Sequence, residues 1–287
     1  MPRGLDHIVH AVHDLDAAAA LYRRLGFTVG ARNRHPWGTH NHIVQFSGCF
    51  IELLAVAEPD QIKGEGVPAL FGRFNQSFLE THEGLSMLVL ESSDAAVDAA
   101  AFSAAGIAAS APVSFEREAQ KPDGSTVRVG FSLAFARDAL APEAGFFTCR
   151  QHYPENFWNP AVQQHANTAT GLAGVVLAAE NPSDHHIFLS AFVGERELLA
   201  TSTGVTVTTP RGEIQVMDPA AFASHFGTPA PDIAGGARLA AIRLAVRDLA
   251  KARAVLDEAG VPATERMGRL VVPPSAAIGA TLAFEAA

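Results

Sequence analysis

Near its start the chain reads Gly4-Leu5-Asp6-His7-Ile8-Val9-His10-Ala11-Val12-His13-Asp14-Leu15, and this run carries the strongest indication of the fold. An apolar strand passes here through a short polar turn into an Ala-rich amphipathic helix, which closes at Leu25-Gly26-Phe27. The same pattern returns at residues 238–249, and weaker copies begin at residues 84 and 171. A supersecondary unit that recurs along a chain constrains the fold more strongly than a single motif does.

The first copy predicts a β-α-β-β-β unit. Asp14 occupies the position of a helix N-cap and Gly26 that of a C-terminal stop. Further strands are expected near residues 27–33, 42–47 and 50–56, the last two joined by a hairpin turn. A single unit of this kind leaves one apolar sheet face uncovered, so units are expected to pair.

The sequence therefore predicts an α+β protein of four β-α-β-β-β units, paired into cupped mixed β-sheets with helices on their outer face. The chain is divided near residue 160 in this interpretation. Residues 1–160 form a first domain of two units that carries the candidate site. Residues 161–287 form a second, degenerate domain of two shorter units.

Composition narrows the class of protein. The 287 residues are 48% hydrophobic and 18% charged, which is typical of a packed globular chain. A net charge of −9 and the lack of basic runs argue against nucleic-acid binding. The first strand is expected from residue 5, which leaves no room for a signal peptide. The apolar runs are too short to span a bilayer, and two cysteines cannot form a disulfide framework. We expect a cytoplasmic protein with neither nucleic-acid nor membrane partners.

Two polar residues stand out in the strands of the first unit. Alternation puts Leu5, His7, Val9 and Ala11 on one face of the first strand. In the last strand of the unit, Phe50-Ile51-Glu52-Leu53-Leu54, it puts Phe50, Glu52 and Leu54 on one face. A glutamate in such a strand is costly to bury unless it is paired, protonated or bound to metal. If both residues line one cup, an imidazole and a carboxylate meet in an apolar cavity. A metal site and a metal-free His–Glu core pair both remain open on this evidence.

Several motifs of the first unit resemble those of the vicinal oxygen chelate superfamily. They are Asp6-His7-Ile8-Val9, Leu25-Gly26-Phe27, Ile51-Glu52-Leu53 and the run Trp37-Gly38-Thr39-His40-Asn41-His42. Within that superfamily, the chain is most similar to glyoxalase-like proteins, of the glyoxalase, bleomycin resistance and extradiol dioxygenase group. The resemblance implies a cupped sheet around a divalent metal, either iron, manganese, zinc or nickel. Its ligands would come from the first and last strands of the units.

Carried over position by position, the resemblance assigns His7 and Glu52 as metal ligands. The positions that match His7 in the other units are Met87, Gly174 and Ala241, which are not usual ligands of a hard metal. His152, near the end of the second unit's last strand, is the predicted third ligand if a bulge corrects its phase. A pocket-rim position for His152 is the alternative. Without a metal, Glu52 would act as a catalytic general base.

Substrate contacts are expected from polar and aromatic residues around the cup. Trp37 would stack on a substrate, Asn41 and Gln45 would form hydrogen bonds, and Arg34 would meet an anion. The full predicted set is Arg34, Trp37, Asn41, His42, Gln45 and Gln151.

Two functions follow from these features. The first is a divalent-metal-dependent glyoxalase-like enzyme, a lyase, isomerase or dioxygenase acting on a small oxygen-bearing organic substrate. The alternative is a metal-free protein that binds or sequesters a small molecule in the same cup. The sequence contains no GxSxG, GxGxxG or P-loop motif that would favour a serine hydrolase or a nucleotide-binding protein. A homodimer is a further expectation that sequence cannot decide.

Overall fold

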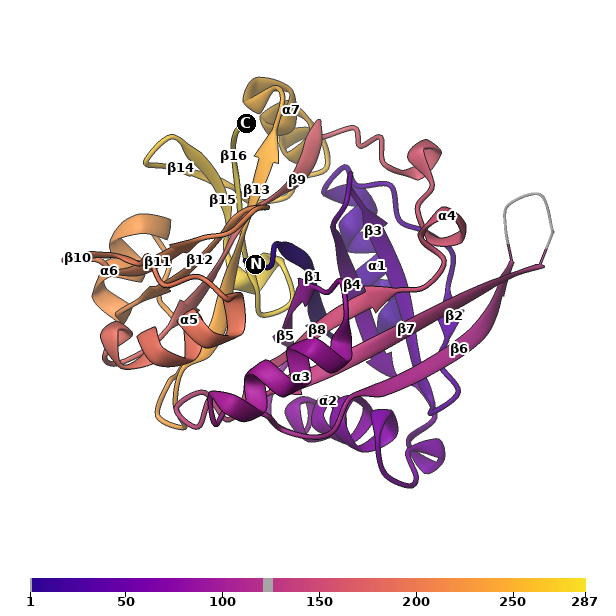
Figure 1. Cartoon of the computed structure of the whole chain (residues 1–287). Coiled ribbons are helices and arrows are strands. Elements are labelled where there is room, and N and C mark those ends of the chain that lie inside the picture. Colours follow the sequence, from indigo (N-terminus) through magenta and orange to yellow (C-terminus); the bar gives the residue numbers. More distant parts are fainter. Residues whose placement is uncertain (1, 121–125) are drawn as a thin grey trace.

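The computed structural model describes residues 2–120 and 126–287 and contains two eight-stranded mixed sheets (Figure 1). The first sheet has the strand order β2-β3-β4-β1-β5-β8-β7-β6. Its strands are β1 (Leu5–Ala11), β2 (Asn33–Arg34), β3 (Thr39–Gln45), β4 (Phe50–Val56), β5 (Gly84–Glu91), β6 (Val113–Gln120), β7 (Thr126–Ala136) and β8 (Gly145–Gln151). The helical segments of this half are α1 (Leu15–Arg24), η1 (Pro59–Gln61), η2 (Pro68–Arg73), α2 (Phe74–Leu79), α3 (Ala95–Ala104), α4 (Pro154–Phe157) and η3 (Pro160–Val162).

The second sheet has the order β10-β11-β12-β9-β13-β16-β15-β14. Its strands are β9 (Ala169–Ala178), β10 (Leu199–Thr201), β11 (Gly204–Thr208), β12 (Glu213–Met217), β13 (Arg238–Val246), β14 (Thr264–Arg266), β15 (Arg269–Val272) and β16 (Thr281–Ala286). Its helical segments are η4 (Pro182–His185), α5 (His186–Val193), α6 (Pro219–Phe226), α7 (Leu249–Glu258) and η5 (Pro274–Ala276).

Both sheets are joined at their centre in the same way. Strand β1 is parallel to β4 and antiparallel to β5, and β9 is likewise parallel to β12 and antiparallel to β13. Each half-sheet thus contains one β-α-β-β-β unit, as the sequence predicted. The α+β fold of paired, cupped mixed sheets is confirmed.

The first helix begins and ends where the sequence predicted. The side chain of Asp14 accepts a hydrogen bond from the Ala17 amide at 2.9 Å, which satisfies one free donor of α1. Gly26 follows with a φ of +87°, and a Cβ there would stand 3.0 Å from the Asn167 amide nitrogen. Glycine is required for this turn because the chain must turn in the left-handed region against another backbone segment. The strand expected over residues 27–33 is only the two-residue β2.

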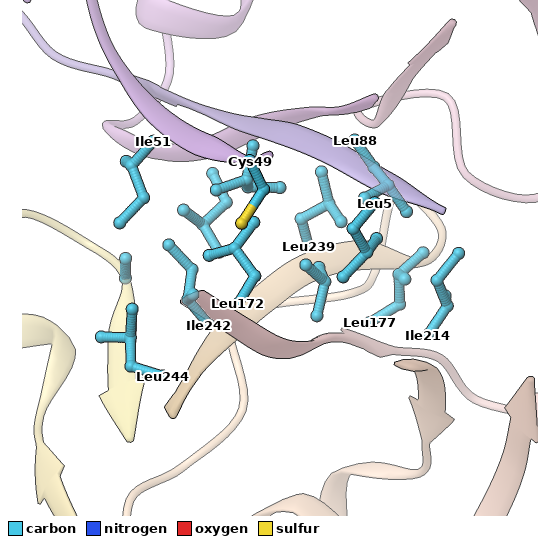
Figure 2. Close-up of a cluster of buried hydrophobic side chains, with 14 of the residues drawn as sticks. Leu5, Cys49, Ile51, Leu88, Leu172, Leu177, Ile214, Leu239, Ile242 and Leu244 are labelled. Carbon is cyan, nitrogen blue, oxygen red and sulfur yellow. The ribbon is translucent and has the colours of Figure 1, made fainter. Parts of the chain in front are cut away.

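The two sheets pack against each other through one continuous hydrophobic core (Figure 2). Side chains of the first sheet meet side chains of the second; among them are Leu5, Ile51, Leu88, Leu177, Ile214, Leu239 and Ile242. Helices α1 and α3 contribute apolar residues to the same cluster, including Tyr22 and Phe102. The opposite face of the first sheet is therefore free to line a cup.

Strand β1 departs from simple alternation at its first residue. Its pairing with β5 shifts register between Leu5 and His7. Alternation predicted that Leu5 would share a face with His7, but the irregularity turns Leu5 into the core between the sheets with Ile8. That part of the face assignment was wrong, whereas Val9 lies on the cup side.

All strands of the first sheet lie within residues 5–151, and those of the second lie within 169–286. The domain boundary at residue 160 falls in the connector between them and stays a prediction. In the part of the chain that the structure describes, every helix is too short or too polar to cross a membrane.

Candidate functional site

The inner face of the first sheet surrounds a narrow, mainly aromatic cavity of about 50 Å³. Strands β1, β3, β4, β6, β7 and β8 and the segment around Trp37 contribute to its wall. The lining residues are His7, His35, Trp37, Asn41, Ile43, Phe50, Glu52, Val67, Phe71, Phe115, Arg117, Phe131, Leu133, Phe147, Cys149 and Phe157. A cavity of this size accommodates a few water molecules or one small chemical group.

Glu52 of β4 is the carboxylate of this cavity and is 4% exposed. Ile43 is opposite Glu52 on β3, and Asn41, two residues before Ile43, donates a hydrogen bond from Nδ2 to Glu52 Oε1 at 2.5 Å. His7 Nε2 lies 3.8 Å from Glu52 Oε2. Burial raises the pKa of Glu52, against the opposing effects of His7, Asn41 and Arg117. Glu52 is thus a carboxylate with one oxygen held by an amide and an increased affinity for a proton.

His7 is held in place by two contacts. Its Nδ1 lies 2.5 Å from Oδ1 of Asp6, and its ring stacks on Phe50 at 4.2 Å between centroids. Because a carboxylate accepts hydrogen bonds, Asp6 places the proton of His7 on Nδ1. The stacking on Phe50 fixes the plane of the His7 ring. The other ring nitrogen, Nε2, is the one near Glu52.

Two basic residues of the cavity, His35 and Arg117, were not predicted from sequence. His35 Nε2 lies 4.0 Å from Glu52 Oε1, and the His35 ring stacks on Trp37 at 4.7 Å. Burial, together with the charges of Arg117 and His40, lowers the pKa of His35 to about 3, so that it is neutral near pH 7. Arg117 of β6 brings a guanidinium to the cavity. Burial lowers its pKa from the ordinary arginine value, and the Glu52 carboxylate acts in the opposite direction.

Sequence offers little signal for these two residues. Arg117 stands in Ser114-Phe115-Glu116-Arg117-Glu118, which is the pattern of an exposed edge strand, and β6 is indeed the last strand of its sheet. Because Phe115 and Arg117 are two residues apart, they share one face of the strand. This spacing does not show that the face closes over β4. His35 lies in an irregular histidine-rich run whose contacts depend on tertiary structure.

The positions of the second half-sheet that match His7 and Glu52 do not supply further metal ligands. His7 and Val89 are opposite each other on β1 and β5, and Val89 is in turn opposite Phe147 on β8. Met87 and Phe147, the counterparts of His7 and Glu52 in the second half-sheet, are apolar or weak donors. Among the described residues, no three His, Cys, Asp or Glu side chains gather as a metal site. The cationic Arg117 at the same cavity also disfavours a divalent cation.

His152 is not brought to the cavity. Its Nε2 is 2.7 Å from Ser132 Oγ and its Nδ1 is 3.9 Å from Glu116 Oε1, at the end of β8. Gln151 beside it is half-buried. Neither residue lines the cavity around Glu52. The assignment of His152 as a metal ligand and that of Gln151 as a substrate contact stay predictions.

The other expected substrate contacts divide into two groups. Trp37 and Asn41 line the cavity with His7 and Glu52. Arg34 is exposed on β2, and His42 Nδ1 lies 2.7 Å from the carbonyl oxygen of Gly30, outside the cavity lining. Gln45 belongs to a second, outer cavity.

The outer cavity has a volume of about 600 Å³ and shares Ile43, Arg117 and Phe157 with the inner one. Gln45 shapes its wall by donating a hydrogen bond to the Phe157 carbonyl at 2.8 Å. It also accepts a hydrogen bond from the Asn159 amide at 3.0 Å. The two cavities therefore adjoin at Arg117 and Phe157, and a molecule larger than the inner cavity has room to extend outward.

Cys149 also lines the inner cavity, but burial raises its pKa well above the ordinary value. The thiol is therefore protonated near pH 7 and is a poor nucleophile.

The cup of the second sheet is occupied by protein. Phe222 and Phe226 of α6 belong to its apolar cluster, and Arg243 forms an ion pair with Glu285 at 2.6 Å.

A family model described as "Glyoxalase-like domain" matches residues 5–193, more than half of the chain. No curated protein matches the sequence. Among solved structures, a hypothetical protein from Staphylococcus aureus is 12% identical, with a TM-score of 0.71 over 99% of this chain and 100% of that one. A mutant of 4-hydroxymandelate synthase from Streptomyces coelicolor is also 12% identical, with a TM-score of 0.55 over 93% and 78%. At these identities, the two structures show likeness of fold alone.

Proposed function

The chain belongs to the glyoxalase-like domain family of the vicinal oxygen chelate superfamily, and from this premise we propose that it is an enzyme. Its substrate is a small oxygen-bearing organic molecule that binds in the cup of the first sheet. The observation that carries the proposal is the buried carboxylate of Glu52, which faces an imidazole in an aromatic cavity. A cavity with few polar groups in an apolar wall is typical of small-molecule sites.

Glu52 is the proposed general base. Its ionised carboxylate takes a proton from a carbon next to a carbonyl group; the C–H bond breaks, an O–H bond forms, and the electron pair moves onto the carbonyl oxygen. Burial raises the pKa of Glu52 and so strengthens it as a base. The hydrogen bond from Asn41 holds Oε1 and leaves Oε2 on the side of His7. Donors in the wall would stabilise the negative oxygen that develops.

This proposal assigns the chemistry to protein groups. Many relatives in the superfamily use a divalent metal, and His7 and Glu52 are the residues that the resemblance assigns to it. The described cavity supplies no third ligand from the matching positions, since these are Met87 and Phe147. No step is therefore assigned to a metal.

Hydrogen–deuterium exchange tests the proposal. We would incubate the protein in D₂O with a panel of small carbonyl compounds and follow deuterium incorporation at carbon by NMR. We expect exchange that Glu52→Gln slows by a factor of about 10² to 10⁴ and that a chelator leaves unchanged. The exposed Glu80→Gln is the matched control. Exchange lost with the chelator and restored by iron, manganese, zinc or nickel would instead support the metal-dependent enzyme.

A metal-free binding protein is the second candidate. The apolar side chains of Met87 and Phe147 at the positions matching His7 and Glu52 favour it, because they leave a cup suited to holding an apolar group. This candidate predicts binding of small molecules without deuterium exchange, and little effect of Glu52→Gln on turnover because none occurs.

A further inference from the structure

The inner cavity contains two buried donors that find no acceptor among the residues that the structure describes. Trp37 Nε1 and Arg117 Nε are both without a hydrogen-bond partner among the described residues. Both residues line the same cavity, and Trp37 is 5% exposed. A buried donor without a partner costs about 1–3 kcal/mol, so proteins rarely leave one, and two at one cavity indicate a group that belongs there.

The two donors are connected through a short aromatic path. Phe115 and Arg117 are two residues apart on β6 and therefore share one face of the strand. The Phe115 ring meets Trp37 edge-on at 4.8 Å between centroids. His35 stacks on Trp37, and the positive charge of Arg117 helps to lower the pKa of His35. Arg117 and Trp37 therefore belong to one side of the cavity, which is positively charged and rich in N–H donors.

The chemistry of this wall selects an acceptor. An arginine fork and an indole N–H donate hydrogen bonds only, so their partner must be an acceptor, and a positive charge favours an anion. The carboxylate that interacts with Arg117 electrostatically is Glu52, whose Oε1 already accepts a hydrogen bond from Asn41. The remaining walls are aromatic, including Phe50, Phe131 and Phe147.

We propose that Arg117 and Trp37 bind the carboxylate of a small organic acid, whose apolar part lies among the phenylalanines of the inner cavity. This inference rests on the proposed function, because it names the substrate class of the same site. A planar carboxylate matches the guanidinium fork, and the cavity of about 50 Å³ limits the enclosed part to a small group. Larger acids extend past Phe157 into the outer cavity.

Calorimetric titration with matched acids and amides tests the inference. The probes are propionate, butyrate and phenylacetate at millimolar concentration, each compared with its uncharged amide of nearly the same shape. We expect at least one acid to bind, and to bind about tenfold or more tightly than its amide, as for hydrogen bonds to charged groups. Equal binding of acid and amide, or no binding of any acid, would overturn the inference.

Variants assign the effect to residues. Arg117→Met is expected to abolish the preference for the acid, Arg117→Lys to retain part of it, and Trp37→Phe to weaken acid binding severalfold. Arg128→Met is the control, since Arg128 is exposed on the neighbouring strand β7. Circular dichroism checks that each variant is folded. An acid preference that survives both Arg117→Met and Trp37→Phe would contradict the assignment.

The outcomes separate this inference from the proposed function. Acid binding that depends on Arg117 without deuterium exchange would keep the inference and remove the enzyme. Glu52-dependent exchange that is equally fast for uncharged carbonyl compounds would keep the enzyme and overturn the inference.

Discussion

At the scale of single residues, the cavity is defined by a few polar groups in an aromatic wall. Sequence reasoning predicted that His7 and Glu52 would face one cup, and the structure places His7 Nε2 3.8 Å from Glu52 Oε2. The sequence allowed this prediction because a polar residue within an apolar strand is conspicuous. Arg117 was missed because its charged neighbours Glu116 and Glu118 make β6 resemble a solvated edge strand.

The buried Glu52 predicts a pH dependence of stability. Its pKa is raised above the ordinary 4.5 in the folded protein, so the folded state holds this proton where the unfolded state has lost it. This contribution to stability is present at low pH and is lost as pH rises through the folded-state pKa. The slope in that window is about 1.4 kcal/mol per pH unit.

We therefore expect Glu52→Gln to remove this decline, so that the variant gains stability relative to the wild type as pH rises toward neutrality. Urea denaturation over this pH range measures it, with the exposed Glu80→Gln as control. If wild type and Glu52→Gln keep parallel pH profiles, Glu52 does not carry a raised pKa.

At the scale of strands, register decides which side chains meet. The structure follows the predicted period of two along β4, but the irregularity in β1 turns Leu5 away from the face of His7. Sequence could not show this, because the register shift arises from pairing with β5, a distant segment. The short β2 likewise replaced an expected strand over 27–33. Ladder pairing with β3 occurs at Asn33 and Arg34, and before them the Gly30 amide donates a single hydrogen bond to the Ile43 carbonyl oxygen at 2.9 Å.

Strand register also predicts how a metal site could be created. Met87 is two residues from Val89, the partner of His7 across β1 and β5, so it is a diagonal neighbour of His7 on the cup face. Met87→His would add an imidazole beside His7 and Glu52. We expect this variant to bind Zn²⁺ or Ni²⁺ near one equivalent in calorimetric titration.

The control for that experiment is Met267→His, at an exposed position far from β1 in sequence. Binding that remains when Glu52→Gln is combined with Met87→His would show that the added metal does not use the predicted ligands.

At the scale of the whole molecule, the two sheets share one core. Sequence predicted that units would pair but not that the sheets would stack, because an apolar face does not identify its partner. Strand β4 is buried on both faces, with Ile51 in the core between sheets and Leu54 on the cup side. His10 of β1 adds a polar contact between the two halves of the chain, because its Nε2 lies 2.8 Å from the carbonyl oxygen of Ile278.

A shared core predicts that the chain unfolds as one unit. Ile242 is fully buried between the sheets, so Ile242→Ala should cost about 2–5 kcal/mol and lower the midpoint of a single transition. Ile187→Ala, at a 66% exposed position, should change stability little. Fluorescence and circular dichroism followed during urea unfolding measure both. Two separate transitions in the wild type would indicate sheets that fold independently.

The proposed function requires the cup of the first sheet to work through its own side chains. Elemental analysis of untagged protein tests this most directly, after anaerobic loading with iron, manganese, zinc or nickel and removal of free ions. We expect metal well below one equivalent, with no difference between the wild type and the His7→Ala and Glu52→Gln variants. Near-stoichiometric metal in the wild type that is lost in both variants would contradict it.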